Sequence, residues 1–232
     1  MLEEPPLLQI RKPKLRPTQA QIDALTGVET GMVCDAMEGK GSLDSSIRAL
    51  GDGERLGCNA VGPALTCDNG PADMLAVMGA VNIAKPGDVI VAGFSGHTGC
   101  ALVGDRLMGI CKNKGCAGFV TDGPMRDFEG IVEAGLPGWC NGLNPASPYT
   151  NGPGWVGFPV QIGGQIVETG DMIVADRTGV VVVPFDMIDK VIKKVKRVKR
   201  LEKDLDKKVR EGFDHFDRID AMLKDGTAKY VR

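Results

Sequence analysis

Apolar residues along the chain alternate between short continuous runs and helical spacing, which predicts strands and helices in turn. The apolar runs within 88–93 and 116–120 are typical of buried strands. Between them, the apolar residues of 104–115 share one helical face, and Gly115 is suited to end that helix. A strand–helix–strand order predicts a crossover connection, with 88–93 and 116–120 lying parallel in one sheet.

Three further helices are predicted nearer the N-terminus. Each starts at a suitable residue: Thr18 and Thr30 as caps, and Pro71 in a first helical turn. The expected ranges are 19–25, 31–38 and 71–84. Alternation within 53–67 indicates a strand in two pieces around Gly62-Pro63.

The C-terminal half is predicted to hold a long loop, a β meander and a long helix. Residues 138–158 are rich in Gly, Pro, Asn and Ser, and a loop of that length is often functional. Glycine pairs or Thr-Gly steps divide 158–184 into strands, and 185–211 repeats apolar residues every three or four positions. We therefore expect an extended N-terminal arm, an α/β domain and a helical tail. The expected ranges are 1–17, 18–184 and 185–232.

Charge and composition narrow the classes of partner. The 232 residues carry a formal net charge of −2, so no global field recruits nucleic acid or an anionic membrane surface. The basic stretch 193–210 also contains acidic residues and an apolar stripe, which favours an amphipathic helix over a nucleic-acid contact. No apolar window is long enough for a membrane span, and the N-terminus lacks the apolar core of a secretion signal. Seven irregularly spaced cysteines without a CxxC motif predict reduced thiols, and so a cytoplasmic protein.

The first candidate for chemistry is the helix start Gly104-Asp105-Arg106-Leu107. Backbone N–H groups in a first helical turn have no intrahelical partner, and they favour an anion such as a ligand carboxylate. The alternative is that Asp105 merely caps its own helix.

The second candidate is Arg126-Asp127, which follows the next strand and a turn at Asp122. Loops at the carboxyl ends of adjacent parallel strands meet at one sheet edge, so this pair is expected to face the 104–107 amides. Arg126 can grip a carboxylate or enolate oxygen, and Asp127 can hold Mg²⁺ or Mn²⁺. The alternative is a surface ion pair, or a carboxylate that starts a helix. Asp122 is expected to make the turn, or else to orient Arg126.

Three stretches together resemble one known family. They are PGDVIVAG, VGDRLMGICKNKGCAGFVTDGPMRD and FPVQIGGQIVETGDMIVADRTGVVVVP. They are similar to the RraA-like family, which includes class II 4-hydroxy-4-methyl-2-oxoglutarate/4-carboxy-4-hydroxy-2-oxoadipate aldolases and the regulator of ribonuclease E activity. The resemblance extends over about residues 25–185. It implies a layered α/β/β/α sandwich related to swivelling β/β/α domains, and homotrimers or homohexamers with active sites at subunit boundaries.

The resemblance also implies roles for individual residues. The backbone of Gly104, Asp105, Arg106 and Leu107 would bind the pyruvyl carboxylate. Arg126 would be catalytic, Asp127 would bind the divalent cation, and Asp105 would orient a water. Two departures are visible: Gly130 stands where aldolases often have an acid, with Glu129 just before it, and Arg106 replaces a usual apolar residue.

The expected function is therefore a metal-dependent lyase. Its substrate would be a small 4-hydroxy-2-oxo di- or tricarboxylic acid, cleaved to pyruvate and a second oxo acid, with oxaloacetate decarboxylation as a side activity. The alternative is a non-catalytic, protein-binding regulator resembling the ribonuclease E inhibitor.

Overall fold

The computed structural model describes residues 6–231. Contacts within the chain divide it into two compact units, one ending at Val195 and the other beginning at Lys196. The three-part division expected from the sequence stays a prediction. The prediction of an N-terminal arm extends over residues 1–5, which lie outside the described residues.

One sheet runs through the first unit, and its central strands are parallel. Along the path the strands are β1 Leu8–Ile10, β7 Gly154–Val156, β3 Ala60–Asp68, β4 Val89–Gly93, β5 Gly118–Thr121, β6 Gly138–Cys140 and β2 Arg48–Ala49. Strand β4 pairs in parallel with β5 through Val89↔Gly118 to Ala92↔Thr121, which confirms the predicted crossover. The carboxyl ends of β4 and β5 therefore lie at one edge, where polar loops follow.

Helices cover one face of this sheet. They are α3 Leu75–Ile83, α4 Asp105–Asn113 and α5 Phe128–Ala134. Buried residues of β3–β5, such as Leu65, Ile90 and Phe119, form one core cluster with Val77 of α3 and Met108 of α4. Alternate residues of the same strands point to the opposite face because side chains alternate along a strand.

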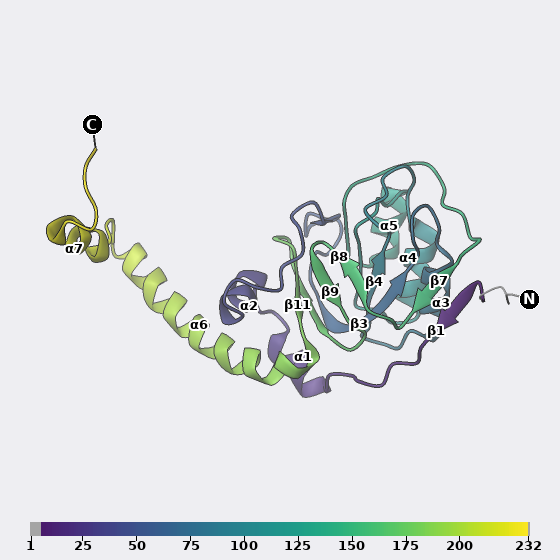
Figure 1. Ribbon diagram of the computed structural model, residues 1–232, viewed down its shortest axis with the longest axis horizontal. Coiled ribbons are helices and arrows are strands. Elements are labelled where there is room, and N and C mark those ends of the chain that lie inside the picture. The colour runs from purple at the N-terminus through teal and green to yellow at the C-terminus, as the bar shows by residue number, and fades with distance from the viewer. Residues whose placement is uncertain (1–5, 232) are drawn as a thin grey trace, which may run out of the picture. The chain divides into compact units, whose positions relative to one another are not determined.

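The opposite face packs against a second layer of strands. Val91 of β4 and Val120 of β5 share a core cluster with Ile162, Ile173 and Val182. These come from two antiparallel hairpins: β8 Val160–Ile162 with β9 Gln165–Val167, and β10 Met172–Ala175 with β11 Val180–Val183. The helix α2, Thr30–Ala36, contacts β10 and β11. Figure 1 shows the resulting order of helices, sheet, strands and helix, the expected α/β/β/α sandwich.

Strand β3 joins the two layers. Its first half, Ala60–Pro63, pairs antiparallel with β10, and its second half, Ala64–Asp68, pairs in parallel with β4. The prediction of two strand pieces around Gly62-Pro63 is therefore wrong, because β3 is continuous. Its pairing partner does change at that point. Gly62 fits because a side chain would lie 2.1 Å from the carbonyl oxygen of Gly87.

Several helix boundaries follow the predicted chemistry. Helix α1, Gln19–Leu25, begins after a capping box between Thr18 and Gln21. Helix α4 ends in a Schellman motif at left-handed Gly115, with Cys116 N donating to Cys111 O at 3.1 Å.

Other predicted elements differ from the structure. Thr30 lies inside α2 and donates its hydroxyl to Asp176 rather than capping the helix. Helix α3 begins at Leu75, not Pro71, because Ala72 is left-handed and Asp73 accepts from Leu75 N. The range 138–158 holds β6 and β7 and is not all loop. The meander is two separate hairpins. Helix α5 was expected only through the alternative that Asp127 starts a helix, and its range was not predicted.

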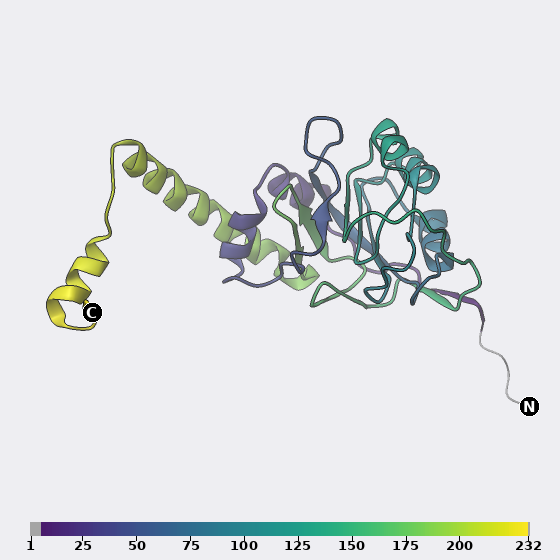
Figure 2. The same ribbon diagram turned by 90° about the horizontal axis from the view of Figure 1, so that it is seen from above.

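The predicted long helix is present, after a short 3-10 turn at Phe185–Met187, as α6 Ile188–Arg210, and a helix α7 follows at Asp217–Asp225. Figure 2 shows α6 as one unbroken helix. Ile188, Val191 and Val195 are buried, whereas Leu201 and Leu205 are about half exposed. No helix within residues 6–231 is both long and apolar enough to cross a bilayer.

Candidate active site

Helix α4 begins with a turn of backbone amides at the end of a buried segment. Gly104 is extended, with φ −134° and ψ −166°, and it supplies no side chain to cap the helix. Met108 N donates to Gly104 O, as expected for the first helical bond. Among the described residues, the amides of Gly104, Asp105 and Leu107 have no acceptor, so the helix start can receive an anion.

A second segment is held directly beside this helix start. Leu102 N donates to Pro124 O at 2.8 Å, and Arg126 N donates to Val103 O at 3.0 Å. Met125 forms a parallel bridge with Val103. These bonds join the loop after β4 to the loop after β5 as far as Gly104 and Arg126.

Gly104, Arg126 and Asp127 meet at this point. A Cβ atom built on Gly104 would lie 2.6 Å from Asp127 Oδ2 and 3.0 Å from Arg126 Cγ. Arg126 Nε lies 3.2 Å from Asp127 Oδ2, and the two side chains are 34% and 47% exposed. The convergence expected from the sequence is thus present, and the ion pair named as its alternative is part of it.

Asp127 owes its direction to an unusual backbone. It is the N-cap residue that precedes α5, in the left-handed conformation with φ 58° and ψ 48°, and its side chain makes no cap hydrogen bond. Asp and Asn tolerate this conformation better than other residues with a Cβ atom. Its carboxylate is therefore available to the space in front of Gly104.

Asp105 both bonds to an amide of its own helix and lies at the candidate site. Its Oδ1 accepts from Arg106 N at 2.6 Å, so it does satisfy one amide of its own helix. A Cβ built on Gly130 would lie 2.7 Å from Asp105 Oδ2 and 2.5 Å from its Cβ. The carboxylate therefore occupies the space that a side chain at residue 130 would need, which gives a physical reason for Gly130.

Two charged residues next to the candidate site, Glu129 and Arg106, are exposed at the surface. Glu129 forms an ion pair with Arg55, so it does not replace an acid at residue 130. Arg106 is exposed, and Leu107 packs partly buried against the helical core.

Asp122 does not act as predicted. Its carboxylate accepts from Phe94 N at 2.6 Å and Gly96 N at 2.8 Å, which fastens the loop after β4. The turn is made instead by Thr121, whose hydroxyl accepts from Gly123 N. Burial raises the pKa of Asp122 above its ordinary value, against the effect of the two amides. No hydrogen bond joins Asp122 to Arg126 among the described residues.

One contact of Arg126 was not foreseen. Its Nη1 donates to the hydroxyl of Ser147, which lies in the segment between β6 and β7. No local motif in the sequence pointed to this serine, because the contact spans 21 positions and depends on the path of the loop.

The larger hollows on the surface lie elsewhere. Two of them, of about 430 and 500 Å³, share Arg48, Ala49 and Leu50 beside β2, and neither is lined by Arg126 or Asp127. The candidate site is instead an open, polar corner of the first unit.

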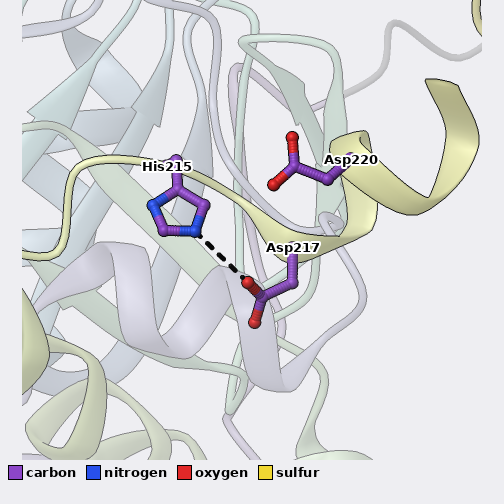
Figure 3. A group of neighbouring side chains, drawn as sticks. All are labelled: His215, Asp217 and Asp220. Carbon is purple, nitrogen blue, oxygen red and sulfur yellow. Dashed lines mark ion pairs between the residues drawn. The ribbon is translucent and has the colours of Figure 1, made fainter. Parts of the chain in front are cut away.

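A separate polar group lies in the second unit. His215, Asp217 and Asp220 are exposed, and one ligand atom of each lies within 4.8 Å of the others (Figure 3). His215 Nε2 lies 3.4 Å from Asp217 Oδ1. The pKa of the His215 imidazole is raised, mainly by its hydrogen bond with Asp214. Exposed acidic groups are common without an ion, so we assign no site there.

Comparisons with known proteins agree with the architecture. A family model described as RraA-like, Aldolase/RraA, matches residues 30–182. A protein of Halalkalibacterium halodurans, whose assigned name is provisionally 4-hydroxy-4-methyl-2-oxoglutarate aldolase, is 36% identical over 178 residues. That match covers 75% of this chain and 83% of the relative.

Solved structures have the same fold. Streptomyces coelicolor RraAS2, described as an unusual member of the RNase ES inhibitor RraA protein family, superposes with a TM-score of 0.72 at 29% identity. The match covers 83% of this chain and 100% of that one. An uncharacterised protein of Pseudomonas syringae reaches a TM-score of 0.75 at 24% identity, over 88% and 94% of the two chains, and supports the fold alone. The expected resemblance is confirmed, and the chain belongs to the RraA-like, Aldolase/RraA family.

Proposed function

We propose that the protein is a divalent-metal-dependent aldolase. It would cleave a 4-hydroxy-2-oxo di- or tricarboxylic acid to pyruvate and a second oxo acid, and decarboxylate oxaloacetate as a side reaction. One observation carries the proposal: the free amides of the α4 start and the Arg126–Asp127 pair meet at Gly104, where an added Cβ atom would lie 2.6 Å from Asp127 Oδ2. The aldolase name of the Halalkalibacterium halodurans relative supports the reaction class.

The donor set fits a hard divalent cation. Asp127 offers a carboxylate that is 47% exposed, and Gly104 leaves the space before it clear. Mg²⁺ and Mn²⁺ favour oxygen ligands, and Mg²⁺ commonly keeps several waters beside one or two carboxylates. Asp127 would hold the cation, with Asp105 close by. When bound, the cation supplies Lewis acidity that polarises the 2-oxo group.

The α4 start would hold the substrate carboxylate. The unpaired amides of Gly104, Asp105 and Leu107 donate from a helix N-terminus, where the backbone dipole favours negative charge. Arg106 adds a side-chain cation at the rim, which would favour substrates with a further carboxylate. This binding fixes the 2-oxo acid so that its carbonyl faces Arg126.

Arg126 and Asp105 would carry the charge and proton changes. As the C3–C4 bond breaks, the electron pair moves toward the 2-oxo oxygen, and Arg126 stabilises the negative charge that develops there. A water held by Asp105 takes the proton of the C4 hydroxyl, and the second oxo acid leaves. The proton is then returned to C3 of the pyruvate enolate, giving pyruvate.

An open corner suits a site that a second subunit completes. Arg126 and Asp127 remain partly exposed in one chain, so a neighbouring subunit could close the site. We propose a homotrimer or homohexamer on this basis. All seven cysteines are free thiols, which suits the reducing cytoplasm.

Pyruvate release tests the proposal directly. The purified protein is given oxaloacetate or 4-hydroxy-4-methyl-2-oxoglutarate, with Mg²⁺ or with a chelator, and pyruvate is measured. We expect release that requires the metal and falls by at least about 10²-fold in Asp127→Asn, since the charged ligand is lost. Glu129→Gln is the matched control, because Glu129 pairs with Arg55. Wild-type rates in Asp127→Asn would remove Asp127 from the mechanism.

A regulatory role is the second candidate. It is favoured by the likeness to Streptomyces coelicolor RraAS2, named as a member of the RNase ES inhibitor family. Such a role needs no intact pocket. Two results together would favour this role over the aldolase. Wild type and Asp127→Asn would inhibit ribonuclease E equally, and neither substrate would give metal-dependent pyruvate release.

A further inference from the structure

The segment between β6 and β7 brings one hydroxyl group to the candidate site. Ser147 accepts a hydrogen bond from Arg126 Nη1, while Asp127 contacts Nε of the same guanidinium. The arginine is therefore held at two places. Among the described residues, Nη2 has no acceptor, so it is the group left to meet a ligand.

The segment before Ser147 is firmly anchored. Asn144 donates its amide nitrogen to Thr98 O at 2.8 Å, and its side-chain oxygen accepts from Ala146 N. Its backbone N donates to Met125 O, and Ala146 O accepts from Ala101 N. These bonds fasten the segment to the same two loops that form the site.

The segment after Ser147 is anchored to a different element. Tyr149 exchanges backbone bonds with Ala72 and Met74, and Asp73 Oδ2 accepts from Asn151 N at 2.6 Å. Pro145 and Pro148 flank the short piece that contains Ser147, and a proline ring restricts the backbone. The side chain of Ser147 is thus exposed, whereas its backbone is held in place on both sides.

A fixed hydroxyl at this place has a chemical use. An arginine side chain carries large rotamer entropy, and holding it before the substrate arrives lowers the cost of the reactive geometry. Asp127 alone fixes only Nε and leaves rotation of the side chain unopposed. A second contact at Nη1 defines the plane of the guanidinium.

We propose that Ser147 is a positioning residue for Arg126. It sets the guanidinium plane so that Nη2 faces the 2-oxo oxygen on which negative charge develops. This rests on the proposed function, because the oxygen belongs to the substrate of that reaction. Ser147 is not catalytic in itself, since it acts through Arg126.

Two substitutions and one control test the role. Ser147→Ala removes the hydroxyl and should lower kcat about 10-fold with little change in KM, as is typical for loss of a hydrogen bond to a charged group. Ser147→Thr keeps the hydroxyl and should restore most of the activity. Thr150→Ala removes an exposed hydroxyl of the same segment that makes no hydrogen bond within residues 6–231, and should behave as wild type.

A double-mutant cycle separates positioning from a structural role of the loop. In an Arg126→Lys background, Ser147→Ala should cost no more than about 2-fold, because the guanidinium it positions is gone. An effect that is the same in both backgrounds would overturn the proposal, as would wild-type kcat in Ser147→Ala.

Ligand binding supplies a readout that needs no turnover. Oxalate, a planar dicarboxylate similar to a pyruvate enolate, is titrated calorimetrically with Mg²⁺ present. We expect Ser147→Ala to bind it several-fold more weakly and Ser147→Thr to bind it as wild type does. An inactive wild type would reject the aldolase itself, whereas an active wild type with unaffected Ser147→Ala would reject only the role of Ser147.

Discussion

Gly130 of α5 lies directly against the side chain of Asp105 in α4. A Cβ atom at residue 130 would come within 2.5 Å of Asp105 Cβ and 3.0 Å of its Cγ. The two helices also have many contacts with each other, so neither can shift easily. The absence of a side chain at residue 130 therefore determines where the Asp105 carboxylate lies.

Substitution Gly130→Ala should displace Asp105 and lower activity. We expect kcat to fall about 10-fold or more while the fold is retained, because alanine favours a helix interior over glycine by about 1 kcal/mol. Steady-state kinetics and thermal melting are measured together. Gly109→Ala is the matched control, since its Cβ would meet nothing within 4 Å in α4. Equal activities of the two variants would contradict this account.

Gly104→Ala should damage the site by a different route. The backbone at Gly104 is extended and acceptable to alanine, so no backbone strain arises. The new methyl group would instead lie 2.6 Å from Asp127 Oδ2. We expect weaker Mg²⁺ dependence and at least about 10-fold lower pyruvate release, with melting within a few degrees of wild type. Unchanged metal titration would show that the close approach has no functional effect.

Asp122 should make stability depend on pH. Its folded pKa is raised above the ordinary value of 3.8, first by burial and also by Asp68. A raised carboxyl pKa means that its contribution to stability is full below the unfolded pKa and is lost as pH rises through the folded pKa. The melting temperature of wild type minus that of Asp122→Asn should therefore decrease from about pH 3 to about pH 6. A difference in melting temperature that increases over this range would contradict the prediction.

The thiols should be slow to react in the native protein. Cys34 is half buried and the other six cysteines are buried. Burial raises the pKa of the Cys34, Cys67 and Cys140 thiols, which lowers the thiolate fraction that attacks an electrophile. The pKa of Cys116 is instead lowered by its hydrogen bond with Cys111, so only its burial protects that thiol. Alkylation with iodoacetamide, followed by mass spectrometry, should modify Cys34 first, and the others only after denaturation. Rapid native modification of Cys67 would contradict the described packing.

The sequence was informative where the chemistry is local. Thr18 and Gly115 mark helix ends through hydrogen bonds to residues three to five positions away, and the apolar runs fix β4 and β5. The order of strand, helix and strand was enough to place Gly104 near Arg126. These features depend on neighbours in the chain, so periodicity and capping rules reach them.

The sequence was less informative where distant segments decide the outcome. Helix α5 was expected only as an alternative, because its N-cap residue Asp127 is left-handed and lacks the usual side-chain cap. Ser147 and Asp122 act through bonds across 21 and 28 positions, which no local spacing reveals. The use of β3 in both layers likewise depends on β10, far along the chain.

The left-handed backbone at Asp127 limits how this protein can be re-engineered. At φ 58°, most residues with a Cβ atom carry a conformational cost, so a glutamate placed there to recruit another ion would strain the start of α5. A laboratory search for altered ion preference would therefore be better directed at neighbouring positions with ordinary backbone angles than at this carboxylate.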